Sequence, residues 1–375
     1  MENSSITPTK FCYVHIPFCD KKCAYCSFVT YEKTEGKEEY INYLIKEINL
    51  YKTNILDTLY FGGGTPSVLD PLLINKIMNE FELSKNAEIT LEFNPEKSYY
   101  KNLKEYKNIG INRLSIGCQT FNDDLLKRIG RIHSSNEVLE AFNLARNENF
   151  KNINLDLMFA LPGQTLENLK EDLNILKKLS PEHISIYSLI WKDGTKFALL
   201  KEKGILKQAP EELEAEMYEY IINFLEENGY IHYEVSSFCK KGFESKHNIS
   251  YWHNENYYGF GLGAAGYLGN IRYSNVTNFK KYYEMLDKNI LPRKEEEIIT
   301  EKKSLEYFLI LKLRMLKEGF NMKELEKKFS IESFYISKLK ELTENKLLFI
   351  EDNIYRLTKK GLFLSNEVFA ELLDI

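Results

Sequence analysis

The feature that most constrains this chain is a run of three cysteines, Cys19, Cys23 and Cys26, separated by three and two residues. Thiolates at such a spacing can surround an iron–sulfur cubane, each binding one iron atom. The run supplies only three ligands, so one iron would stay open to another molecule, as catalytic zinc sites keep one open position. The first prediction is therefore a [4Fe–4S] cluster on these three cysteines.

Zinc binding and burial in the core are the alternative uses of this triplet. A zinc ribbon needs a second pair of cysteine or histidine ligands at a short spacing, and the sequence has no suitable pair. Structural cysteines occur singly along a chain, as Cys12, Cys118 and Cys239 do here. Three cysteines within eight residues are explained more simply by a cluster.

Charge and hydropathy limit the classes of function. No apolar stretch reaches the 18 residues typical of a membrane-spanning helix, and residues 1–10 lack the apolar core of a signal peptide. We therefore expect a cytoplasmic protein, in which disulfides are rare. The formal net charge of -5 argues against a partner of nucleic acid. Peripheral contact with a membrane surface is left open.

Strand and helix signals alternate through the first two thirds of the chain. Amphipathic stretches, such as residues 37–51 and 166–179, separate short β-type runs, and this order is typical of parallel βαβ units. The runs cover residues 11–16, 58–61, 88–93, 113–117, 152–158 and 183–189. They predict an α/β fold, an open sheet or a partial (β/α)6 barrel, with function at the C-terminal ends of the strands.

The pattern changes after Gly204, and the chain divides into three predicted parts. Residues 1–235 form the barrel, and residues 236–290 are an extension rich in glycine and aromatic residues. Residues 291–375 resemble a small α+β winged helix, with three helices and a hairpin at residues 347–357. Over residues 301–375, 14 Lys and Arg stand against 13 Asp and Glu, so we expect a packing or lid role rather than DNA binding.

Glycines and polar residues at the predicted strand ends form a candidate cofactor site. Three glycines and a threonine, residues 62–65, follow the second strand, and glycine lets the backbone approach a ligand closely. Glu92 ends the third strand, where its carboxylate could accept hydrogen bonds from a ribose. Gln119, Arg131 and Asp156 lie near later strand ends. Each alone is more often a cap or a surface charge, and it is their order along successive strands that indicates a site.

The cysteine loop after a first barrel strand resembles that of the radical S-adenosylmethionine (SAM) superfamily. In that family the open iron chelates the amino and carboxylate groups of SAM, and an electron breaks the sulfonium bond to give a 5′-deoxyadenosyl radical. From about residue 11 to its end, the chain resembles one branch, oxygen-independent coproporphyrinogen III oxidase and its relatives. The resemblance implies that cluster-bound SAM contacts Tyr13, Tyr25, Gly63, Gly64, Thr65 and Glu92. It also implies that Gln119, Arg131 and Asp156 match the positions that contact a second SAM in the oxidase.

Two features separate this chain from the oxidase itself. The oxidase has a further cysteine two residues after the third ligand, where this chain has Phe28, and a longer segment before the first strand. The string His247-Asn-Ile-Ser-Tyr251-Trp252 resembles the heme-binding motif of HemW-type heme chaperones. In such a motif the imidazole would bind heme iron and the aromatic rings would pack on the porphyrin. A buried histidine beside two core aromatic residues is the alternative.

The resemblance therefore implies a heme chaperone that binds a [4Fe–4S] cluster, SAM and heme, and that delivers heme to an apo-haemoprotein. An oxygen-independent coproporphyrinogen III oxidase, or another radical SAM enzyme acting on porphyrin, is the alternative. Nucleic-acid binding through the C-terminal module is a third class, which the balanced charge disfavours. The sequence alone does not decide whether the protein is an enzyme.

Alanine at Cys19, Cys23 or Cys26 is expected to abolish the cluster, since each thiolate would hold a different iron. Anaerobically reconstituted wild-type protein should contain about four iron and four sulfide per chain. Iron and sulfide assays check this, with Cys118→Ala and Cys239→Ala as controls that keep the cluster. Stoichiometric zinc without iron in the freshly purified protein would contradict the assignment.

Overall fold

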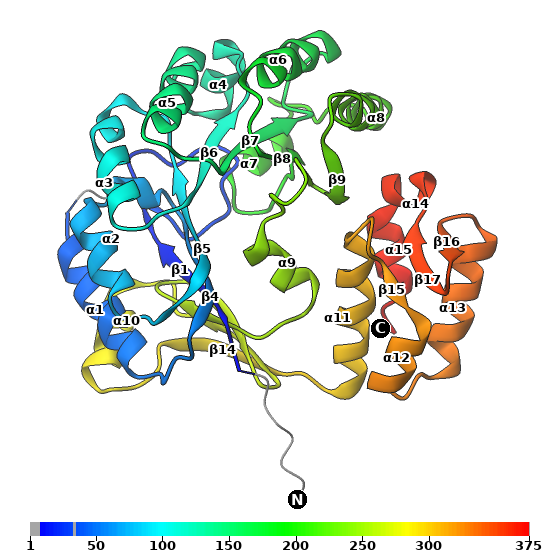
Figure 1. The fold of residues 1–375 in the computed structure, drawn as a ribbon. Helices are drawn as coiled ribbons and strands as arrows, with labels where there is room; N and C mark the ends of the chain where they lie inside the picture. Colours follow the sequence, from blue (N-terminus) through cyan, green and yellow to red (C-terminus); the bar gives the residue numbers. More distant parts are fainter. Residues whose placement is uncertain (1–7, 33–34, 375) are drawn as a thin grey trace, which may run out of the picture.

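A computed structural model describes residues 8–32 and 35–374, and Figure 1 shows a strongly curved sheet with helices around its outer face. Residues 1–7, most of the N-terminal stretch that lacks the apolar core of a signal peptide, lie outside the described residues. Seven described strands of this sheet run parallel, in the spatial order β11, β1, β4, β5, β6, β7, β8. They are β1 (Phe11–Ile16), β4 (Leu56–Gly63), β5 (Leu83–Phe93), β6 (Arg113–Gln119), β7 (Ile153–Phe159), β8 (His183–Ser188) and β11 (Tyr257–Phe260).

The six predicted β-type runs correspond to six of these strands, and β11 is an addition. β11 comes from the stretch rich in glycine and aromatic residues, and it pairs in parallel with β1, so that Tyr257 lies opposite Phe11. A pairing between such distant residues leaves no local pattern in the sequence. The α/β class is confirmed, and the strands and helices form a partial barrel.

Antiparallel strands extend both edges of the sheet. Beyond β11 lie β12 (Ala265–Leu268), β13 (Ile271–Asn275) and β14 (Arg293–Ile298), and beyond β8 lie β10 (Ser237–Cys239) and β9 (Ile231–Glu234). The proposed boundaries after residues 235 and 290 therefore both fall within one continuous sheet. The three-part division stays a prediction, and the structure adds that the middle part belongs to the barrel sheet.

Amphipathic helices cover the convex face because strand residues alternate between two environments. In β4, Leu59 and Phe61 are buried among the apolar residues of the core, whereas Tyr60 lies on the inner side with Tyr13 opposite it. The longer helices around the barrel are α1 (Lys37–Asn49), α2 (Pro71–Met78), α5 (Ser135–Asn147), α6 (Leu166–Leu179), α8 (Glu211–Glu227) and α10 (Phe279–Asp287). Short helices α3 (Leu103–Asn108), α4 (Asp123–Ile129) and α7 (Lys196–Glu202) lie between strands. The apolar core thus lies outside the sheet, and polar side chains remain for its interior.

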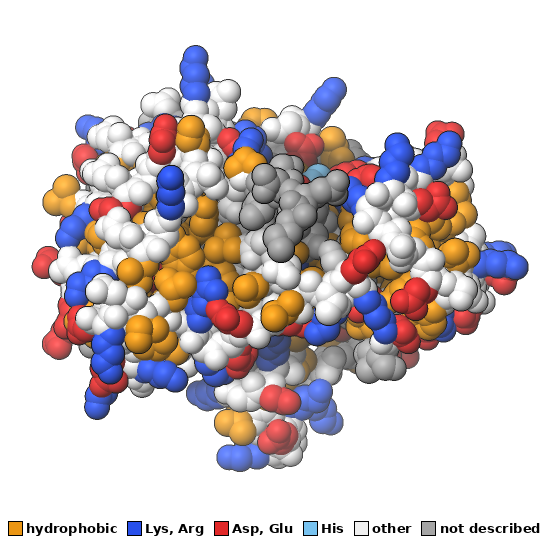
Figure 2. All heavy atoms as spheres, turned by 90° about the horizontal axis from the view of Figure 1, so that it is seen from below, with side chains coloured by type: hydrophobic (Ala, Val, Ile, Leu, Met, Phe, Trp, Pro, Cys, Tyr) orange, Lys and Arg blue, Asp and Glu red, His pale blue; other side chains and the backbone are white. Residues whose placement is uncertain are grey.

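The C-terminal module stands beside the barrel (Figure 1). It contains α11 (Glu301–Arg314), α12 (Met322–Lys328), α13 (Ser333–Glu344), α14 (Lys359–Phe363), α15 (Ser365–Glu371) and a sheet of β15 (Phe320–Asn321), β17 (Ile354–Leu357) and β16 (Leu348–Glu351). The predicted helices and hairpin are therefore present. Figure 2 shows acidic and basic side chains intermingled on the face seen from below.

Helix α9 (Lys246–Trp252) lies between the barrel and this module (Figure 1). Trp252, at its end, carries the Arg314 guanidinium over its ring at 4.3 Å, and His253 lies 2.8 Å from a carboxylate oxygen of Glu318. The helix therefore contacts both parts of the molecule. In the described part of the chain, no helix combines the length and the apolar character needed to cross a membrane.

A buried carboxylate fixes helix α1 to the part of the sheet that β11 and β13 form beside β1. Glu47 is fully buried and accepts hydrogen bonds from the Gly261 backbone N–H at 2.8 Å, the Asn275 amide at 2.6 Å and the Tyr282 hydroxyl at 2.5 Å. Burial raises its pKa to about 7. Three polar groups, one just after β11 and one each from β13 and α10, thus depend on one side chain of α1.

Replacing Glu47 with alanine is expected to lower the free energy of unfolding by about 3 kcal/mol, because three buried donors lose their acceptor. Urea denaturation of the full chain, followed by circular dichroism, measures the change. Glu39→Ala, at an exposed position of the same helix, should change the free energy by less than about 0.5 kcal/mol. Equal effects of the two substitutions would contradict the role assigned to Glu47.

Candidate functional site

The three cysteines lie on the loop that follows β1, at the C-terminal end of the barrel. Cys19 is buried within β2 (Phe18–Cys19), which pairs with β3 (Tyr31–Glu32), and Cys23 and Cys26 are partly exposed. The Cys26 backbone N–H donates to the Cys23 carbonyl at 3.1 Å, which makes a tight turn between them. All six cysteines of the chain are free.

Neighbouring elements hold the middle of this loop. The Ala24 backbone N–H donates to the Ile129 carbonyl at the end of α4, at 3.1 Å. The Ala24 carbonyl accepts from the Phe197 N–H of α7, at 3.0 Å. Gly130 follows α4 with a φ of 85°, and a Cβ there would lie 3.2 Å from the Ala24 nitrogen. Glycine therefore suits this position both by its backbone conformation and by its size.

The residues of the loop fit a [4Fe–4S] cluster. Among the described residues, no three His, Cys, Asp or Glu side chains converge as ligands of one metal ion. A cubane does not require that convergence, since each thiolate binds its own iron. Arg131 places Nη1 3.6 Å from the Cys23 sulfur, and the Thr65 hydroxyl lies 3.4 Å from the Cys19 sulfur. A guanidinium group therefore lies beside the Cys23 sulfur and a hydroxyl beside the Cys19 sulfur. Both sulfur atoms carry negative charge when they bind iron.

The glycine run, residues 62–64, lies against the start of the cysteine loop. The Gly64 N–H donates to the Ile16 carbonyl and the Thr65 N–H to the Phe18 carbonyl, both at 2.8 Å. A Cβ on Gly64 would lie 2.6 Å from the Phe18 carbonyl oxygen, a distance too short for two atoms that are not bonded. Gly63 has a φ of 113°, which favours glycine. The two loops therefore form one unit.

Glu92 is held against this unit. One carboxylate oxygen accepts from the Gly63 N–H at 3.1 Å, and the other accepts from the Tyr60 hydroxyl at 3.0 Å. Burial, and then the neighbouring charge of Asp156, raise the pKa of Glu92 to about 7. The predicted ribose acceptor thus lies next to the glycine run, as the sequence indicated.

Tyr13 and His15 connect the barrel interior to the cysteine loop, and His15 was not among the predicted residues. The Tyr13 hydroxyl lies 3.0 Å from His15 Nδ1, and His15 Nε2 lies 2.8 Å from the Val29 carbonyl. Burial lowers the pKa of His15 to about 4, so its ring is neutral. The sequence could have indicated His15, because alternate residues of a strand point to the same face and His15 is two residues after Tyr13 in β1.

The other predicted SAM contacts lie in surroundings that differ from one residue to the next. They are Gln119, Arg131, Asp156 and Tyr25. Gln119 ends β6 with a φ of 69°. Arg131 donates to the Gly117 carbonyl of β6 at 2.6 Å, and its other terminal nitrogen lies 3.6 Å from the Cys23 sulfur of the cysteine loop. Asp156 lies inside the barrel, where it accepts hydrogen bonds from a serine and an asparagine, at 3.1 and 2.7 Å. Tyr25 packs near Phe197, with ring centroids 6.5 Å apart.

His247 lies away from the cysteine loop, buried on α9. Its Nδ1 is 2.7 Å from the Thr58 hydroxyl, its Nε2 is 2.7 Å from the Tyr251 hydroxyl, and its ring stacks on Tyr60 with centroids 5.0 Å apart. Burial, and then the charge of Arg113, lower its pKa to about 3. Both ring nitrogens are thus engaged, and this arrangement does not fit axial binding to heme iron.

Arg113 is a further residue that the sequence did not single out. It lies at the start of β6, 2% exposed, and its Nε has no hydrogen-bond partner in the described structure. Its positive charge contributes to lowering the pKa of both His183 and His247. The sequence could have indicated Arg113, because it is two residues before Ser115 on the same strand and so shares its face. Ser115 faces inward, where its hydroxyl donates to Asp156.

Two segments of this chain match known protein families. Residues 13–176 match the radical SAM superfamily, and residues 299–364 match the HemN C-terminal domain. The heme chaperone HemW of Bacillus subtilis (strain 168) is 40% identical over 376 residues, covering 97% of this chain and 99% of that protein. This chain belongs to the HemW family. The HemW of Lactococcus lactis subsp. lactis (strain IL1403) is likewise 40% identical, over 96% of each chain.

The fold is shared with a solved structure of coproporphyrinogen III oxidase (HemN) from Escherichia coli, described as a radical SAM enzyme. The TM-score is 0.85 with 22% sequence identity, covering 97% of this chain and 90% of that one. At that identity the likeness concerns the fold. The predicted membership of the radical SAM superfamily, in its HemW branch, is thus confirmed.

Replacing Gly64 with alanine is expected to remove most of the iron from the reconstituted protein. The added Cβ would meet the carbonyl of Phe18 in the cysteine loop at 2.6 Å and that of Ile16 at the end of β1 at 2.9 Å, and backbone cannot rotate away. Gly204→Ala is the control, because a Cβ there meets nothing within 4 Å and costs only the backbone strain of about 1–2 kcal/mol. Full iron content in Gly64→Ala would contradict the proposed contact.

Proposed function

We propose that this protein is a radical SAM heme chaperone, which binds a [4Fe–4S] cluster, SAM and heme and delivers heme to an apo-haemoprotein. The observation that carries the proposal is the 40% identity to heme chaperones named HemW over nearly the full length of both chains. Delivery in the cytoplasm is the setting expected from the sequence. The recipient would be a protein, and no role for nucleic acid is proposed.

The geometry at the C-terminal end of the barrel supports the first two cofactors. Cys19, Cys23 and Cys26 would hold the cluster, which when bound can pass an electron to SAM. The SAM amino group would meet the backbone around Gly63, and Glu92 would accept hydrogen bonds from the ribose. Glu92 already has hydrogen bonds to Tyr60 and Gly63, so little conformational freedom would be lost when a ligand binds.

A coproporphyrinogen III oxidase is the second candidate, favoured by the shared fold and by Gln119, Arg131 and Asp156 at positions for a second SAM. We rank it lower for two reasons. Phe28 stands where the oxidase has a cysteine, and the relatives of 40% identity are chaperones. In addition, Arg131 and Asp156 have partners of their own here. Arg131 contacts the Gly117 carbonyl and the Cys23 sulfur, and Asp156 accepts hydrogen bonds from two side chains of the barrel interior.

Titration with hemin under anaerobic conditions is expected to give saturable binding of heme by the reconstituted protein. Incubation with coproporphyrinogen III, SAM and a reductant should leave the porphyrinogen unchanged, because Phe28 stands where the oxidase has a cysteine. Absorption spectra follow the first experiment and chromatography of the porphyrins follows the second. Conversion to protoporphyrinogen IX at a useful rate would replace the chaperone with the oxidase.

A further inference from the structure

Two side chains at the C-terminal end of the barrel contact the sulfur atoms that would bind the cluster. Arg131 Nη1 donates to the Cys23 sulfur at 3.6 Å, and the Thr65 hydroxyl lies 3.4 Å from the Cys19 sulfur. Both sulfur atoms carry negative charge as ligands of iron. The two contacts would therefore act on the cluster through its ligands, whether or not SAM is bound.

Strand β6 holds the Arg131 guanidinium beside Cys23. Arg131 Nη2 donates to the Gly117 carbonyl at 2.6 Å, and a Cβ on residue 117 would lie 2.5 Å from that nitrogen, so glycine leaves the room that the guanidinium occupies. Within the described part of the chain, the ion pairs of arginine involve other residues, and Arg131 Nε is buried without a hydrogen-bond partner. The positive charge of Arg131 is therefore not cancelled by a paired carboxylate.

Asn94 determines the direction of the hydrogen bond between Thr65 and Cys19. The Asn94 side-chain amide donates to the Thr65 oxygen at 3.1 Å, so this oxygen already accepts one hydrogen bond. A cysteine that binds iron as a thiolate has no proton to donate, so the Thr65 hydroxyl is the donor to Cys19. Cys19 is buried, and a hydrogen bond to a charged group is stronger where water is excluded.

We propose that Arg131 and Thr65 raise the reduction potential of the cluster, acting through Cys23 and Cys19. The inference rests on the proposed function, since it concerns the cluster of that protein. Reduction adds one electron from an external reductant to the cluster, and no bond forms or breaks. A cation and a hydrogen-bond donor at the sulfur atoms stabilise the added negative charge, and charge and hydrogen bonds of this kind set the potentials of iron–sulfur clusters. Both are positioning residues, because they contact the cysteine ligands and not the iron.

Potentiometric titration of the reconstituted full chain without SAM tests this, with the reduced cluster followed by electron paramagnetic resonance. At a fixed potential, Arg131→Gln should raise the ratio of oxidised to reduced cluster about tenfold, the effect of losing one hydrogen bond to a charged group. For one electron this is a shift of about 59 mV to lower potential. Arg131→Lys keeps a cation and should restore most of the wild-type ratio. Thr65→Val removes the hydroxyl at a similar side-chain shape and should shift the potential in the same direction by a smaller amount.

A second variant displaces the guanidinium without removing its charge. Gly117→Ala adds a Cβ 2.5 Å from Arg131 Nη2 and should also lower the potential. Iron and sulfide assays check that each variant holds a full cluster.

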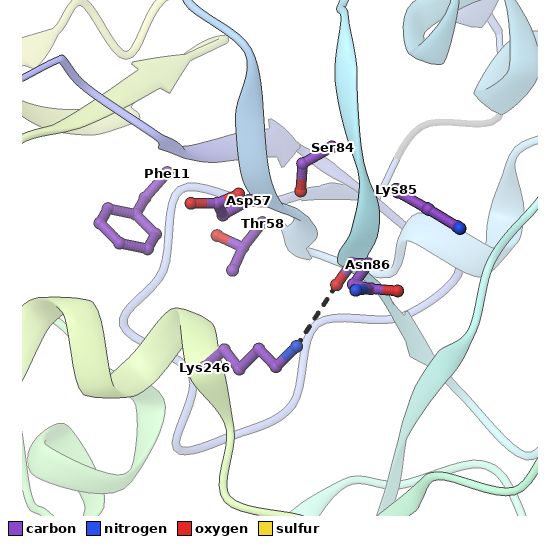
Figure 3. Close-up of a pocket in the computed structure, with 7 residues that line it drawn as sticks. All are labelled: Phe11, Asp57, Thr58, Ser84, Lys85, Asn86 and Lys246. Atoms are coloured by element: carbon purple, nitrogen blue, oxygen red, sulfur yellow. Dashed lines mark hydrogen bonds between the residues drawn. The ribbon is translucent and has the colours of Figure 1, made fainter.

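Lys85 supplies the control, because it lies at the N-terminal end of β5, beside a cavity of about 550 Å³ at the end of the barrel opposite the cysteine loop (Figure 3). Lys85→Gln removes one positive charge, as Arg131→Gln does. An exposed charge at that end is screened by solvent and salt, so the potential should keep its wild-type value.

Failure of the inference can be told apart from failure of the proposed function. Wild type that takes up no cluster would refute the proposed function. Full clusters with wild-type potentials in Arg131→Gln and Thr65→Val would overturn the inference alone. A shift in Arg131→Gln that requires SAM would also overturn it and would assign Arg131 to SAM binding. If Arg131→Gln loses its cluster, wild-type potentials in Thr65→Val and Gly117→Ala would overturn the inference.

Discussion

The contact between the glycine run and the cysteine loop is the constraint on which the rest of the site depends. Two backbone hydrogen bonds of 2.8 Å join residues 64 and 65 to the carbonyls of Ile16 and Phe18. They form only because the chain at Gly64 carries no Cβ, which would lie 2.6 Å from a carbonyl oxygen. The loop that would hold the cluster and the turn that would hold SAM are therefore positioned by one another, through backbone that side-chain motion cannot displace.

Tyr60 joins this end of the barrel to the other. Its hydroxyl binds Glu92 beside the glycine run, while its ring stacks on His247 at 5.0 Å and on Tyr13 at 6.0 Å. Tyr13 in turn contacts His15, which holds the Val29 carbonyl in the cysteine loop. A continuous set of hydrogen bonds and ring contacts thus runs from α9 to the cofactor end. Such buried polar networks are stable only when their members have partners, which explains why both nitrogens of His247 are engaged.

Helix α9 gives the string around His247 a structural role. Glu88 on β5 accepts from the first two N–H groups of the helix, and Trp252 at its other end packs against Arg314 of the C-terminal module. The helix thus packs between the N-terminal end of β5 and the C-terminal module.

The sequence by itself determined the chemistry and most of the local structure. Cysteine spacing indicated a cluster, and the alternation of β-type runs with amphipathic stretches indicated the parallel strands, because these signals lie in neighbouring residues. Glu92 and the glycine run could be placed together because parallel strands end at one edge of a sheet. Tertiary structure alone decided the pairing of β11 with β1, the burial of His247 and the position of Arg113. These depend on contacts between residues far apart in the chain, and whether an imidazole nitrogen is free is settled by its neighbours in space, here Thr58 and Tyr251.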